Sequence, residues 1–182
     1  MKKTLGLISF LGFLSLALIP SGAFAEMTAS TSVKPSGSAV GELKHLTELL
    51  TDGQEGYKLA ADGARTPDLK KVFTEAGEQR TRFLDDMRAE VSKLGGDPFE
   101  GGTALGPLER GWINIRTALS RNDDKVLVDE VLRSENITLK GYQDALDKDL
   151  PSDARKMVEK QRNDIQKTFD KIKKIDLKQE KK

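Results

Sequence analysis

Apolar residues recur every three or four positions along four segments of this 182-residue chain, and this spacing constrains the fold more than any other feature. It places apolar side chains along one face of an α-helix, and each such face must be buried against another element. No segment alternates apolar and polar residues, so no β-strand is predicted. The four apolar faces run from Leu43 to Ala60, Leu69 to Leu94, Val128 to Leu146 and Ala154 to Ile175.

Residues that typically begin and end helices separate these segments. Thr66 is predicted to cap the second helix, with Pro67 in its first position, and Gly95 follows its end. Asp124 lies where the positive end of the third long helix favours an acid, and Ser152 is predicted to cap the fourth. Four amphipathic helices of this length favour an all-α four-helix bundle.

A shorter amphipathic segment, Thr103–Ser120, lies between the second and third long helices. Its roughly 18 residues cover about 27 Å as a helix, which is enough to carry the chain back along the bundle. The third long helix would then run parallel to the second. One long crossover is typical of ferritin-like folds, so we expect a ferritin-like four-helix bundle with a short crossover helix between helices two and three.

The N-terminal segment has the features of a secretory signal peptide. Lys2 and Lys3 precede an apolar run from Leu5 to Ile19, and Ala23, Phe24 and Ala25 fit the small-x-small cleavage pattern. We therefore expect cleavage after Ala25 and a periplasmic or secreted protein. The chain has no Cys, which excludes disulfides and a cysteine-linked lipid anchor. The expected organisation is a signal peptide (1–25), a disordered linker (26–38), the helical bundle (39–176) and a basic tail (177–182).

Polar residues interrupt the apolar faces near the middle of three predicted helices. These residues are Arg80, Glu135 and Gln161. A lone buried charge is costly unless it is paired or neutralised, so either Arg80 faces Glu135 or Glu135 faces a metal ion. Both interpretations predict a buried polar layer of Arg80, Glu135 and Gln161 at the centre of the bundle.

The centre of the bundle is also where ferritin-like di-metal proteins hold iron or manganese, using a Glu from each of two helices and a Glu-x-x-His pair from each of the other two. This chain has one histidine, His45, which forms such a pair with Glu42 near the start of the first helix, where we expect solvent exposure. A complete di-metal centre is therefore not predicted. A degenerate carboxylate site for Fe or Mn is the alternative, and its candidate ligands are Glu135, Gln161, Asp164 and Glu78.

Several short motifs are spread over about residues 42 to 176. They comprise Asp52–Tyr57, Gln79–Arg80 with Phe83, Leu94–Gly96, Gly111–Trp112, Arg121–Asp124, Glu135, Tyr142, Ala145–Leu146 and Leu150–Pro151. Together they resemble a bacterial ferritin-like family of unknown function, whose members are small four-helix-bundle proteins. The resemblance implies a ferritin-like bundle and no assigned catalytic activity.

Charge and composition narrow the function further. A formal net charge of +1 gives no general attraction for nucleic acid, and a single histidine leaves little acid–base chemistry. We expect no catalytic residue and no cofactor. The leading hypothesis is an exported, non-catalytic bundle that contacts an unidentified protein or further copies of itself in the cell envelope, without stable membrane insertion. The rival hypotheses are iron or manganese binding or oxidation at the degenerate site, and carriage of a small apolar ligand between the helices.

Overall fold

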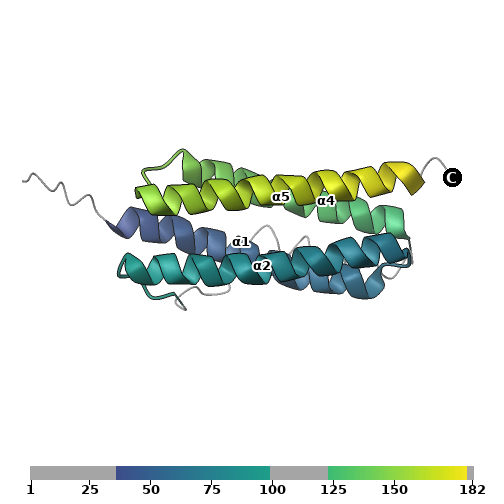
Figure 1. Ribbon diagram of the computed structural model, residues 1–182, viewed down its shortest axis with the longest axis horizontal. Helices are drawn as coiled ribbons and strands as arrows, with labels where there is room; N and C mark the ends of the chain where they lie inside the picture. The colour runs from purple at the N-terminus through teal and green to yellow at the C-terminus, as the bar shows by residue number, and fades with distance from the viewer. Residues whose placement is uncertain (1–35, 99–122, 180–182) are drawn as a thin grey trace, which may run out of the picture. The chain divides into compact units, whose positions relative to one another are not determined.

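Four long helices make up the part of the protein that the structure describes. The computed structural model describes residues 36–98 and 123–179, with side chains described for 38–98 and 123–176. The helices are α1 (Ser36–Gly63), α2 (Pro67–Lys93), α4 (Asp124–Leu146) and α5 (Ser152–Gln179). They lie side by side (Figure 1), and the described ranges contain no strand. The predicted all-α four-helix fold is therefore confirmed for these residues.

Helix α2 begins and ends where its sequence indicates. Pro67 occupies its first turn, where a missing N–H costs nothing. Gly95 has a φ of 78°, and the N–H of Gly96 donates to the carbonyl of Val91 at 2.9 Å. This is the left-handed glycine termination common at helix C-termini, where any residue with a Cβ would be strained.

Two helix starts differ from the prediction. Thr66 stands at the N-cap position of α2, but its side chain makes no capping hydrogen bond. Its hydroxyl donates instead to Asp124 at 2.5 Å, because α4 begins beside this turn. Ser152 is the first residue of α5 rather than its cap, and the carbonyl of Pro151 accepts from the N–H of Arg155 at 2.9 Å.

The predicted boundaries of the linker and tail also shift. Helix α1 begins at Ser36, so the last three residues of the expected linker (26–38) are helical. Ala39 in the next turn is buried against the apolar core, which favours extending the helix to this point. Helix α5 continues to Gln179, three residues beyond the expected end of the bundle. The signal peptide and the rest of the linker lie outside the described residues.

Each helix contacts two neighbours. Helix α1 packs against α2 and α4, and α5 packs against the same two helices. Helices α1 and α5 are therefore diagonal to each other, as are α2 and α4. None of the described helices combines the length and apolar character needed to cross a membrane.

The composition of two apolar clusters shows in which direction each helix runs. One contains Leu46 near the start of α1, Met87 near the end of α2 and Ala145 near the end of α4. The other contains Ala60 near the end of α1 and Val128 near the start of α4, together with the first half of α2. Helices α2 and α4 thus run in the same direction. The crossover helix predicted at Thr103–Ser120 lies outside the described residues.

Helix α4 carries a glycine, Gly141, where it packs against α1. A Cβ added at Gly141 would overlap Cδ1 of Leu49 on α1. Leu49 is buried in the core and packs over this position. Gly141 is therefore required by close helix packing rather than by an unusual backbone conformation.

Candidate functional site: a buried polar layer

A charged pair crosses the middle of the bundle from α2 to α4. Nη2 of Arg80 donates to both carboxylate oxygens of Glu135, at 2.7 Å each. Arg80 is fully buried and Glu135 is 2% exposed. Because α2 and α4 are diagonal, the pair lies in the interior between the two apolar clusters.

The Arg80 side chain lies against Gly53 of α1 and beside two aromatic rings. Gly53 on α1 has no side chain, and a Cβ added there would lie 3.6 Å from Nε of Arg80, in ordinary contact. The guanidinium carbon lies 5.4 Å from the ring centroid of Tyr57 and 5.9 Å from that of Phe83. Both distances fall within the range of cation–π attraction. The cation is thus held by a carboxylate and two aromatic rings.

The other nitrogens of Arg80 are less well satisfied. Nη1 donates to Oε1 of Gln79, an oxygen that also accepts from the Thr168 hydroxyl at 3.2 Å. Nε has no hydrogen-bond partner. Burial is the largest single influence and lowers the pKa of Arg80, but the charge and hydrogen bonds of Glu135, together with nearby Tyr57 and Tyr142, raise it by more, so the pKa lies above its ordinary value. Arg80 therefore carries a full positive charge, and most of its compensation comes from Glu135.

The two tyrosines of the chain flank this pair. Burial is the main cause that raises the pKa of Tyr57, and the nearby Glu135 charge raises it further. The Tyr57 hydroxyl faces that charge without a well-formed hydrogen bond. Burial likewise raises the pKa of Tyr142 far above its ordinary value. Both side chains are therefore neutral phenols across the physiological range.

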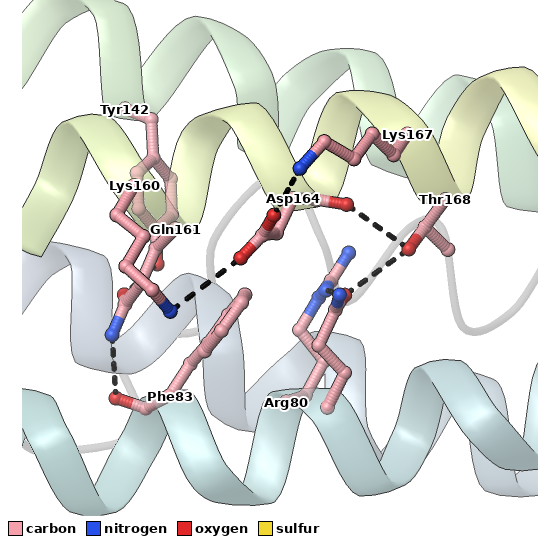
Figure 2. A network of polar contacts seen from close by, with 9 residues as sticks. Arg80, Phe83, Tyr142, Lys160, Gln161, Asp164, Lys167 and Thr168 are labelled. Atoms are coloured by element: carbon pink, nitrogen blue, oxygen red, sulfur yellow. Dashed lines mark hydrogen bonds and ion pairs between the residues drawn. The ribbon is translucent and has the colours of Figure 1, made fainter.

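Gln161 on α5 completes the layer. Its Oε1 accepts from the Tyr142 hydroxyl at 2.7 Å, and its Nε2 donates to the backbone carbonyl of Phe83 at 3.3 Å (Figure 2). Gln161 is 1% exposed. The oxygen and the nitrogen of its amide are both hydrogen-bonded to other residues of the protein, and Gln161 thereby links α5 to both α2 and α4.

The remaining candidate ligands do not join Glu135. Asp164 on α5 accepts from Lys167 at 2.7 Å and pairs with Lys160 at 3.6 Å (Figure 2). The hydrogen bond from Lys167 is the main cause that holds its pKa below the ordinary value. Glu78 on α2 is exposed and lines a groove between α1 and α2. The four candidates are therefore dispersed rather than gathered around one point.

The single histidine does not complete a metal site either. His45 is 57% exposed and lies 3.6 Å from Glu48, one turn along α1. Among the described residues, no three or more His, Cys, Asp or Glu side chains come together as a metal-binding group. A di-iron or di-manganese centre needs bridging carboxylates and neutral nitrogen ligands. The donor set at the centre of this bundle, one carboxylate already bound to a guanidinium, does not fit such a centre.

The groove between α1 and α2 has a volume of about 520 Å³. Tyr57 and Phe73 contribute aromatic surface to it, and its charged lining residues are Glu55, Lys58, Asp62 and Glu78. A hydrogen bond of 2.6 Å from Gln54 to Thr81 crosses between the two helices. The aliphatic hydroxyls that line the groove belong to Thr74 and Thr81, and each donates to a backbone carbonyl of its own helix.

A second polar cluster, which the sequence did not predict, lies at the turn between α1 and α2. The Asp124 carboxylate accepts from the N–H groups of Arg65 and Thr66 at 2.9 Å each, in addition to the Thr66 hydroxyl. Partial burial raises the pKa of Asp124, but these hydrogen bonds outweigh it, so the pKa lies below its ordinary value. Asp124 thereby fastens the start of α4 to the α1–α2 turn. The residue types at this turn indicate a helix start but do not reveal a partner 58 residues away.

Comparison with known proteins identifies the family to which the chain belongs. No curated protein matches the sequence. Residues 38–148, which include α2, α4 and nearly all of α1, match a family described as Domain of unknown function (DUF2383). The match covers more than half of the chain, and the protein belongs to this family of unknown function.

Proposed function

We propose that this protein is an exported, non-catalytic bundle of ferritin-like type that acts through protein contacts in the cell envelope. This proposal rests on the hydrogen bonding within the polar layer of Arg80, Glu135 and Gln161. Arg80 already occupies both oxygens of Glu135, and Gln161 is held by Tyr142 and the Phe83 carbonyl. Because the Glu135 carboxylate and the Gln161 amide are both occupied by neighbouring residues of the protein, the arrangement supports a structural role for the centre of the bundle.

Two further features support the finer parts of the proposal. The parallel direction of α2 and α4 is the arrangement expected from one long crossover, as in ferritin-like bundles. The N-terminal sequence, with Lys2 and Lys3 before an apolar run and small residues at Ala23 and Ala25, supports export.

The test is to purify the protein from its native cells without chelators. After fractionation at a salt concentration that releases peripherally bound proteins, we expect it in the soluble envelope fraction, with Glu26 as its first residue and with iron and manganese far below one per chain. Chemical crosslinking in intact cells, followed by purification from either side, should recover the same partner protein or a further copy of this chain. Near-stoichiometric metal that is lost on Glu135→Ala substitution would refute the proposal, as would a cytoplasmic protein that retains residues 1–25.

A further inference from the structure

Helix α5 carries a straight row of lysines on its outward face. Its lysines are spaced four, seven, four and three residues apart. At roughly 100° per residue, all of them fall within a sector of about 60° around the helix axis. All five side chains are exposed, with 73% exposure for Lys160 and 77% for Lys167. From first to last the row spans about 27 Å. We name this row the α5 lysine ridge, and it consists of Lys156, Lys160, Lys167, Lys171 and Lys174.

Two acids pair with ridge lysines, and three further exposed acids of α5, Asp153, Glu159 and Asp170, lie within one turn of them. Asp164 pairs with Lys160 and Lys167, and Glu75 on α2 pairs with Lys171. Asp164 is only 26% exposed, well below the two lysines it contacts. Exposed pairs of this kind contribute little energy, and lysines readily exchange them for other anions. With nine basic residues against five acidic ones, α5 as a whole carries a net charge of +4.

The helix diagonal to α5 has the opposite charge. Helix α1 contains five acidic residues and two lysines, and it makes no contact with α5. One side of the bundle is therefore positive and the side across from it is negative. Near an anionic plane, this distribution favours one orientation, with α5 toward the plane and α1 away from it.

The composition of the ridge indicates the kind of partner. Protein–protein interfaces are depleted in lysine and enriched in aromatic residues, Met and Arg, and the ridge contains none of those types. Lysine-rich surfaces are typical of proteins that bind anionic lipid headgroups, where each lysine strengthens binding by roughly fivefold. A straight row on a rod-like helix can also contact a flat surface along its whole length. We propose that the α5 lysine ridge holds this protein peripherally against an anionic lipid bilayer.

This inference goes beyond the proposed protein contacts and does not depend on export. Its test is co-sedimentation of the full chain with vesicles of 30% phosphatidylglycerol in phosphatidylcholine, at low and at physiological salt. The ridge variant replaces four lysines: Lys156→Gln, Lys160→Gln, Lys167→Gln and Lys174→Gln. A control variant of the same net charge replaces exposed lysines of the other helices: Lys58→Gln, Lys70→Gln, Lys71→Gln and Lys140→Gln.

The wild type should bind anionic vesicles in a salt-sensitive way. Affinity should fall at least about tenfold in the ridge variant and less than about threefold in the control. Vesicles of phosphatidylcholine alone measure any binding by the apolar N-terminal segment, which all three proteins share. Circular dichroism checks that each protein is folded. Equal losses in both variants, or no preference for anionic vesicles, would overturn the proposal. It would also fall if the ridge variant lost salt-sensitive self-association while still binding vesicles, because the ridge would then serve contact between copies of the chain.

Discussion

Replacing Glu135 by alanine should destabilise the protein more than any exposed acid-to-alanine change. The substitution removes both acceptors of the Arg80 Nη2 group, each at 2.7 Å. Arg80 is fully buried, and what remains is one hydrogen bond from Nη1 to Gln79, because Nε has no partner. A guanidinium left this poorly compensated in the interior costs about 3–5 kcal/mol.

The assay is urea denaturation followed by far-ultraviolet circular dichroism, with the free energy of unfolding compared between variants at equal m-value. Asp144→Ala is the matched control, since it removes an acid from an ion pair on the same helix. Asp144 is 54% exposed and its partner Lys140 is 74% exposed, so the control should lose less than about 1 kcal/mol.

A double variant distinguishes the cost of an unpaired buried charge from the cost of losing the whole ion pair. Arg80→Met combined with Glu135→Leu replaces both charges by apolar groups, and replacing a whole buried pair is often neutral or stabilising. The double variant should therefore be more stable than Glu135→Ala alone by at least about 2 kcal/mol. A loss below about 1 kcal/mol in Glu135→Ala would mean that Arg80 finds other compensation, and the reasoning would be refuted.

Three further predictions concern other parts of the bundle. Asp124→Asn should lower the free energy of unfolding by about 1–2 kcal/mol at pH 7. Because the folded-state pKa of Asp124 is lowered, that difference should be present above about pH 5 and vanish as the pH falls below about 4, which denaturation curves at several pH values would reveal. Gly53→Ala should raise the melting temperature, because a Cβ fits there and alanine favours the helix by about 1 kcal/mol. Gly141→Ala should lower the melting temperature by overpacking. If both variants shifted the melting temperature in the same direction, the packing described would be contradicted. The two tyrosines have raised pKa values, so their contribution to stability is complete below about pH 10 and is lost above it. Ultraviolet titration should show phenolate only together with alkaline unfolding, and ionisation of a folded protein near pH 10 would contradict their burial.

Much of the fold follows from local sequence signals. A spacing of three and four residues suffices to locate four helices, and Pro67 and Gly95 bound α2 through their own backbone preferences. Charged residues on an otherwise apolar face, such as Arg80 and Glu135, can also be located in this way. Their burial makes a partner necessary, because an isolated charge in the interior is costly.

What the sequence could not provide depends on distant parts of the chain. The Thr66 hydroxyl does not form the expected cap, because it donates instead to Asp124 of α4. Asp164 shares a turn of α5 with Gln161, yet Asp164 faces lysines while Gln161 points into the core. At roughly 100° per residue, positions 161 and 164 differ by only about 60° around the helix axis, and this small angle separates a core amide from a surface ion pair.

The central claim is that the protein's own side chains, and not a bound cation, neutralise Glu135. Diffraction from crystals of protein purified without chelators, recorded above and below the iron and manganese absorption edges, tests it most directly. We expect the Arg80 guanidinium in contact with both Glu135 oxygens and no anomalous peak between α2 and α4. A strong anomalous peak coordinated by Glu135, with Arg80 displaced from it, would contradict the account.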